Sequence, residues 1–227
     1  MAKKAGAKRS TRSKTARAAA IPTRDQIIDA LMALLAARDF SEISLADVAE
    51  EAGVSLDILR ETYDGKLPII ADFSRRIDRT VLDGGAAEGE GARDRLFEIM
   101  MRRFDALGPY KDAVGHIAQA LRSDPCLAAF AHRNATRSAK AMLAGADAES
   151  SGLFGAIAGQ GLILVHADAL RVWLNDDDPG LAKTMAALDR GLGRGARAMK
   201  IADSVCANLR SFVCQPRAKS DGAAADA

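Results

Sequence analysis

Apolar residues recur at every third or fourth position along most of the chain, and no run alternates as a half-buried strand does. This pattern predicts an all-α protein. The first helix follows Pro22, where Thr23 and Gln26 have capping-box spacing, and its apolar face runs from Ile27 to Leu35. Beyond residue 66, Gly, Pro and Asp punctuate the pattern, which predicts helices over 67–82, 92–107, 110–122, 125–146, 152–174 and 179–212.

Two short helices are predicted between the first helix and residue 66. Ser44 can cap the first of them, with Asp47 at the third position of a capping box. Gly53 stands where a helix ends in a left-handed residue, and Ser55 caps the next helix two residues later. Two short helices joined so tightly predict a helix-turn-helix, whose second helix directs its start outward. The residues expected on the inner face of that second helix are Ile58, Leu59 and Tyr63.

Composition divides the chain into segments, with the glycine-rich run DGGAAEGEG at 83–91 as the predicted domain boundary. We expect the helices 152–174 and 179–212 to pair with their copies in a second subunit. The predicted segments are a disordered basic tail (1–20), a helix-turn-helix domain (21–66), a connecting helix with a Gly-rich linker (67–91), a helical regulatory and dimerisation domain (92–214) and a disordered polar tail (215–227).

Charge is unevenly distributed, although 32 Lys and Arg against 30 Asp and Glu leave a net charge of only +2. The first 17 residues hold seven basic side chains and no acid, whereas residues 21–66 hold four basic and ten acidic ones. DNA binding depends on the neutralisation of phosphate charges, so an acidic helix-turn-helix needs basic residues from elsewhere. The basic tail, called the arm below, would supply them, and the alternative is that this arm only keeps the protein soluble. The arm residues expected to enter a minor groove are Arg9, Arg12, Lys14 and Arg17.

The stretch ISLADVAEEAGVSLDILRETYDGK, residues 43–66, resembles the DNA-binding domain of TetR-family transcriptional regulators. The family pattern is a hydrophobe, Thr or Ser, a helix ending in Ala-Gly-Val-Ser, a recognition helix, an aromatic residue and a Lys that opens the next helix. The resemblance covers about residues 22–82 and departs at Asp57, where Gly is usual, and at Arg60, where Tyr is usual. The residues that it places at DNA are Ser44, Ser55, Leu56, Asp57, Arg60 and Tyr63, with Lys66 on a phosphate.

This resemblance implies a ligand-responsive regulator of repressor type that binds double-stranded DNA as a homodimer. An apolar effector would bind between helices of the second domain, tilt the fourth helix and change the separation of the two DNA-reading heads.

A second, looser resemblance covers about residues 92–195, in ARDRLFEIMMRRFDALGPYKDAV and WLNDDDPGLAKTMAALDRGL. These segments are similar to the TetR-fold lipid-binding proteins of ubiquinone biosynthesis, which hold isoprenoid lipids and lack clear DNA binding. Their Trp-rich features near the first helix are missing at Asp39-Phe40-Ser41. The alternative function is therefore a lipid-binding accessory protein, and only this alternative involves a membrane.

Met, aromatic and His residues of the C-terminal part indicate an apolar pocket, because such side chains line adaptable cavities. Core packing explains each of them singly, and the pocket follows only from their number. The residues expected to bind the ligand are Phe97, Met101, Phe104, His116, Phe130 and Trp173.

Several classes of function are disfavoured. The cysteines Cys126, Cys206 and Cys214 are too few for a disulfide framework and fit a reducing cytoplasm. The sequence shows no secretory signal, no metal-ligand spacing and no Ser-His-Asp order, so we expect neither an enzyme nor a cofactor. Residues 152–174 are apolar but interrupted by polar groups, which predicts a buried helix of a soluble protein.

Overall fold

The computed structural model describes residues 24–149 and 151–213, which fold into helices with no strand among them. The predicted all-α class is confirmed. The first helix covers residues 24–37. The elements that follow are η1 (Phe40–Glu42), α2 (Leu45–Glu51), α3 (Leu56–Thr62), α4 (Lys66–Asp83), α5 (Ala92–Leu107), η2 (Gly108–Tyr110), α6 (Lys111–Ala120), α7 (Pro125–Gly145), α8 (Gly152–Trp173) and α9 (Ala182–Val213).

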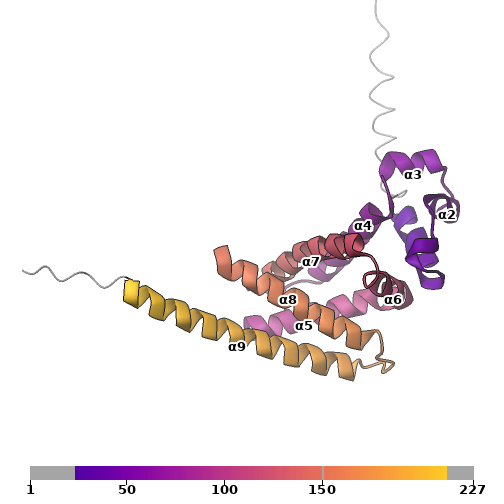
Figure 1. Ribbon diagram of the computed structural model, residues 1–227. Helices are drawn as coiled ribbons and strands as arrows, with labels where there is room; N and C mark the ends of the chain where they lie inside the picture. Colours follow the sequence, from indigo (N-terminus) through magenta and orange to yellow (C-terminus); the bar gives the residue numbers. More distant parts are fainter. Residues whose placement is uncertain (1–23, 150, 214–227) are drawn as a thin grey trace, which may run out of the picture.

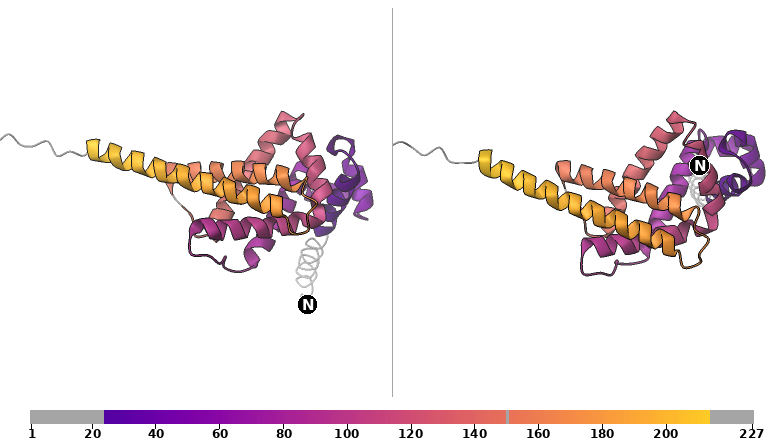
Figure 2. Two further views of the ribbon diagram at one scale, coloured as in Figure 1. Left: turned by 90° about the horizontal axis from the view of Figure 1, so that it is seen from below. Right: turned by 60° about the horizontal axis from the view of Figure 1, so that its bottom comes forward.

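The first helix, α2 and α3 gather at one end of the molecule, and we call residues 24–66 the head (Figure 1). Helix α4 leads from the head into the body, where it packs against α5 and α7. Helices α8 and α9 lie side by side, and the C-terminal part of α9 extends beyond the other helices (Figure 2). The capping position Thr23 and the predicted tails 1–20 and 215–227 lie outside the described residues.

One apolar core connects the head with the body. Ile27 and Leu31 of the first helix are fully buried, as are Ile69 of α4 and Phe104 of α5. The same cluster of packed side chains continues to Leu188 of α9. Movement of α4 would therefore be transmitted through packed side chains, because close-packed interiors pass displacements on rather than absorb them.

The α8–α9 pair depends on a close approach of the two helices. A Cβ atom on Gly191 would lie 2.8 Å from Val165 Cγ1, so a larger residue would push the helices apart. Helix α9 begins at residue 182 rather than at the predicted 179, because buried Asp176 organises the preceding turn. The Thr184 backbone N–H and hydroxyl donate to Asp176 Oδ2 at 2.9 and 2.8 Å.

Burial of α8 differs from the expectation. The sequence predicted a buried helix over 152–174, but Leu153 is 74% exposed, Leu164 is 71% exposed and Ile157 is also exposed. By length and composition α8 is the one described helix apolar enough to span a membrane. The prediction was wrong because α9 and the body cover only one side of α8, and the other side carries an uncovered apolar stripe.

Candidate nucleic-acid interface and ligand cavity

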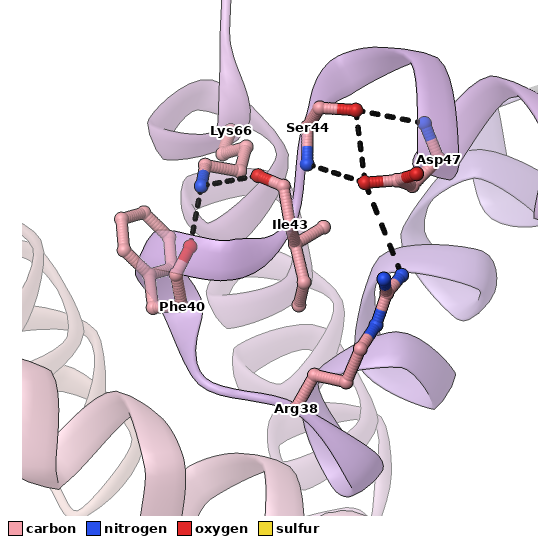
Figure 3. Close-up of polar contacts among 6 residues, drawn as sticks. All are labelled: Arg38, Phe40, Ile43, Ser44, Asp47 and Lys66. Carbon is pink, nitrogen blue, oxygen red and sulfur yellow. Dashed lines mark hydrogen bonds and ion pairs between the residues drawn. The ribbon is translucent and has the colours of Figure 1, made fainter.

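Serine caps define the two short helices of the head, as predicted. Ser44 Oγ accepts a hydrogen bond from the Asp47 N–H at 3.1 Å, and Asp47 Oδ2 accepts one from the Ser44 N–H at 2.7 Å (Figure 3). The Ser44 backbone and hydroxyl donors lower the pKa of Asp47. Ser55 Oγ accepts from the Ile58 N–H at 3.3 Å, and Gly53 turns the chain between the helices with a φ of 64°. Local sequence therefore sets the helix-turn-helix geometry.

Lys66 holds the head together at the start of α4. Its Nζ donates to the Phe40 carbonyl oxygen at 2.5 Å and to the Ile43 carbonyl oxygen at 2.6 Å (Figure 3). The same nitrogen lies 4.1 Å from the centre of the Phe40 ring, and burial lowers the pKa of the Lys66 ammonium. Two N–H bonds of the ammonium are thus used inside the protein, and one remains. The contact of Lys66 with a DNA phosphate, which the resemblance implies, stays a prediction.

Tyr63 is placed differently from the predicted DNA contact. Its side chain is only 4% exposed, and its hydroxyl donates to Asp72 Oδ2 of α4 at 2.7 Å. Burial raises the pKa of Tyr63. The residue lies one helical turn after buried Leu59, so it belongs to the inner face of α3 and joins α3 to α4. The inner-face position predicted for Tyr63 is confirmed, and its expected DNA contact is corrected to a packing role.

The outer face of α3 is open to solvent. Ser55, Leu56, Asp57 and Arg60 are exposed, as is Ser44 at the start of α2. These five predicted DNA-contacting residues therefore lie at the surface of the head. The structure adds one residue that the sequence analysis placed inside.

That residue is Ile58, which is 46% exposed, whereas the sequence pattern placed it on the inner face. One residue advances a helix by about 100°. Since Leu59 points into the core, its neighbour Ile58 turns toward solvent. The outer face of α3 therefore carries two exposed apolar side chains, Ile58 and Leu56.

Most cations of the head are already engaged. Arg24 pairs with Asp72 at 3.2 Å, and Arg38 lies 3.9 Å from Asp47. With Lys66 bound to carbonyl oxygens, Arg60 is the only Lys or Arg of residues 24–66 for which the structure shows no protein partner. The head would attract DNA phosphates weakly by itself. The predicted arm residues Arg9, Arg12, Lys14 and Arg17 lie outside the described residues.

A cavity of about 380 Å³ lies between α4, α5, α6, α7 and α8. Its wall is mainly apolar, with Ile70 and Phe73 from α4, Met100 from α5, Ile117 from α6 and Leu170 from α8. This volume falls within the range of small-molecule sites. Since α4 also carries the head, the cavity adjoins the helix that connects the two parts of the molecule.

Only Phe130 of the predicted ligand-binding residues lines this cavity. Phe104 and Trp173 are buried in the core beside it, with ring centres 5.8 Å apart. His116 instead donates from Nδ1 to the Leu35 carbonyl oxygen at 2.6 Å and so ties α6 to the first helix. These three predicted ligand contacts are corrected to packing roles.

Phe97 and Met101 lie four residues apart on α5, half-buried and outside the cavity wall. Met100, one residue before Met101, faces the cavity instead. The step of about 100° per residue explains the difference, because composition does not fix the rotation of a helix about its axis. Phe97 and Met101 are therefore corrected to packing residues of another face of α5.

A buried polar cluster borders the cavity, and we use the term polar cluster for Ser74, Asp78, Arg103 and Ser138. Arg103 of α5 pairs with Asp78 Oδ1 of α4, and both side chains are about nine-tenths buried. Ser138 of α7 donates to Asp78 Oδ2 at 2.7 Å, and its hydroxyl lies 3.3 Å from that of Ser74. The cluster connects α4, α5 and α7 at the cavity wall. Sequence periodicity gave no signal for it, because these residues are far apart in the chain.

His166 of α8 is another polar residue of the wall, which also includes His132 and Asn134 of α7. The structure shows no hydrogen-bond partner for its Nδ1, which is withdrawn from solvent. Burial, with the nearby charge of Arg103, lowers the pKa of His166 to about 3. The imidazole is therefore neutral at physiological pH, and one ring nitrogen donates while the other accepts.

Comparison with solved structures finds several regulators of one fold. A TetR transcriptional regulator from Nitrosomonas europaea is 22% identical, with a TM-score of 0.61 over 76% of this chain and 97% of the regulator. One from Rhodococcus sp. RHA1 is 16% identical, with a TM-score of 0.57 over 77% and 94% of the two chains. A TetR-family regulator from Streptomyces coelicolor is 16% identical, with a TM-score of 0.50 over 85% and 98%.

Sequence comparison adds no closer relative, since no protein-family model and no curated protein match the chain. The structural matches nevertheless cover nearly the whole length of each regulator. This chain has the fold of the TetR-family transcriptional regulators.

Proposed function

We propose that this protein is a DNA-binding transcriptional regulator. The observation that carries the proposal is the head itself, in which caps at Ser44 and Ser55 hold α3 with its outer face in solvent. A helix presented in this way suits insertion into a major groove, where its first residues meet base edges. The solved structures of the same fold are described as transcriptional regulators, which supports the same function.

Within this proposal, Arg60 reads the groove and the basic residues 1–20 supply phosphate contacts. Arg60 has no protein partner among the described residues of the head, so its guanidinium is free to contact bases or phosphates. A guanidinium binds guanine edges and phosphates with two parallel hydrogen bonds. Ser55, Leu56 and Asp57 would lie beside it at the start of α3.

The protein is further proposed to act as a homodimeric repressor in the cytoplasm. The uncovered stripe of Leu153, Ile157 and Leu164 on α8 is a surface suited to a second copy, and Met185 of α9 is exposed as well. Two-fold symmetry would place two heads on half-sites about 34–36 Å apart, or a multiple of that distance.

Ligand response would work through α4. This helix contributes Ile70, Phe73 and Ile77 to the cavity wall and carries the head at its other end. A ligand that fits only one position of α4 would shift the heads toward one separation. Release of DNA on ligand binding is the repressor behaviour that this arrangement supports.

Selection of bound duplexes from a random pool tests the function directly. We expect the full chain to enrich a palindromic sequence and Arg60→Ala to lose that preference. Arg137→Ala is the matched control, because Arg137 is exposed on α7, away from the head. Failure of the full chain to enrich any sequence would contradict the proposal.

One observation favours a second candidate, the lipid-binding accessory protein. Helix α8 is apolar enough for a membrane and largely uncovered, and the head carries one unpaired cation among its described residues. In that case liposomes should recover the protein by flotation, and organic extraction should yield an isoprenoid quinone. A protein that stays below the liposomes and extracts without lipid would exclude this candidate.

A further inference from the structure

The cavity wall carries its polar groups on a small part of an otherwise apolar surface. Arg103 is the only Lys, Arg, Asp or Glu among the lining residues, and its charge is balanced by Asp78 behind it. One N–H of the guanidinium is used in that pair, and the structure shows no acceptor among the described residues for the others. Hydrogen-bond donors therefore remain at the wall without an uncompensated charge.

His166 gives the same wall a second, complementary group. Its ring lines the cavity, and its Nδ1 lacks a hydrogen-bond partner. A neutral imidazole offers one donor and one acceptor. Nδ1 itself is closed off from the cavity, so a ligand gains this bond only when the ring turns Nδ1 toward it. Because a buried polar atom without a partner destabilises its surroundings, that bond would add to the affinity.

The balance of charge decides what kind of ligand fits. The pair of Arg103 and Asp78 is neutral in sum, and His166 adds no charge. A carboxylate or ammonium ligand would therefore bring an unpaired charge into an apolar cavity, which costs far more than burying a neutral polar group. A hydroxyl can accept from Arg103 and also exchange a hydrogen bond with His166, whereas a ketone or ester can only accept.

We propose that the cavity binds an uncharged, mostly apolar molecule that carries one hydroxyl group, held at Arg103 and His166. The cavity volume of about 380 Å³ suits a small ligand, such as a single ring with a short alkyl chain. This proposal rests on the cavity being the effector site of the proposed regulator. Its test uses no DNA, so the two proposals can fail separately.

Four probes of similar shape separate the ligand classes in calorimetric titrations of the full chain at neutral pH. They are para-butylphenol, butylbenzene, para-butylbenzoate and para-butylbenzylamine. We expect the phenol to bind about tenfold more tightly than each of the others, which corresponds to about 1.4 kcal/mol. Tightest binding of a charged probe, equal binding of phenol and butylbenzene, or no binding by any probe would overturn the proposal.

Substitution of His166 tests the site within the same protein. His166→Phe should bind butylbenzene about as well as the parent and lose most of the preference for the phenol. His166→Gln, which keeps a donor and an acceptor, should retain part of that preference. An unchanged preference in His166→Phe would overturn the assignment of His166. Should either variant fail to fold, the ranking of probes on the parent protein still decides the ligand class.

Discussion

The Ser138 hydroxyl of α7 donates a hydrogen bond across 2.7 Å to Asp78 Oδ2 of α4. The other oxygen of the same carboxylate pairs with Arg103 of α5. One carboxylate thus joins three helices at the wall of the cavity, on the helix that carries the head. Both charged side chains are almost completely buried, so each depends on the other for compensation.

Arg103→Met should therefore destabilise the protein strongly, because it leaves Asp78 buried without a counter-charge. We expect a loss of about 3–5 kcal/mol in the free energy of unfolding, measured with urea. The double variant Asp78→Leu/Arg103→Met should recover much of that loss, since no buried charge remains. Arg171→Met, which breaks an exposed pair with Asp168, should cost less than about 1 kcal/mol. Equal losses of stability in Arg103→Met and Arg171→Met would contradict the role of the buried pair.

Acid should destabilise the protein through His166. Its pKa is about 3 in the folded state against 6.5 for an ordinary histidine, so the unfolded state binds more protons between these values. Stability therefore falls as the pH drops through that window. From pH 7 to pH 5 the linkage amounts to about 2 kcal/mol. Urea unfolding at a series of pH values measures it.

His166→Phe provides the comparison, because a phenyl ring does not titrate. Its stability should change with pH by about 2 kcal/mol less than that of the parent between pH 7 and pH 5. Parallel pH profiles for the two proteins would mean that another group causes the acid sensitivity.

Local signals explain why the sequence predicted most of the fold. The capping box at Ser44 and Asp47, the cap at Ser55 and the turn at Gly53 lie within a dozen residues, and the structure contains all of them. Apolar spacing likewise predicted each later helix to within a few residues. The start of α9 was missed because it depends on Asp176, whose contact with Thr184 no periodic pattern reveals.

The cavity was harder to predict, because it depends on how each helix is rotated. Met100 and Met101 are adjacent and chemically identical, yet only Met100 faces the cavity. His116 and His166 likewise differ only in what packs around them, a backbone carbonyl in one case and the cavity in the other. An ion pair between residues far apart in the sequence, such as Asp78 and Arg103, forms only when their helices pack together, so periodicity along the chain does not reveal it.

Lys66→Met tests whether Lys66 is first a structural residue. Its two bonds to the Phe40 and Ile43 carbonyl oxygens would be lost, and both acceptors lie in the turn before α2. We expect the free energy of unfolding to fall by about 2 kcal/mol, as for hydrogen bonds to a charged group. Lys140→Met, on the exposed surface of α7, should leave stability nearly unchanged. Weaker DNA binding at unchanged stability would instead assign Lys66 to a phosphate alone.

Leu164→Glu tests the proposed dimer. Leu164 is 71% exposed on α8, in the stripe assigned to the second copy. At a two-fold interface one substitution introduces a charge from each subunit, so the variant should be a monomer in analytical ultracentrifugation. Ile58→Glu is the matched control, because Ile58 is an exposed apolar residue of the head. A dimer that persists in Leu164→Glu, or a parent protein that is a monomer, would contradict this interface.

Deletion of residues 1–20 tests whether the arm or the head makes most of the phosphate contacts with DNA. Among the described residues of the head only Arg60 lacks a protein partner, so most counterion release on DNA should come from the seven basic residues of the arm. Each lost phosphate contact should reduce the slope of log affinity against log salt by about 1. Fluorescence anisotropy at several salt concentrations measures that slope. Removal of residues 215–227 is the control truncation and should leave the slope unchanged. Equal slopes with and without residues 1–20 would mean that the head, and not the arm, makes the phosphate contacts.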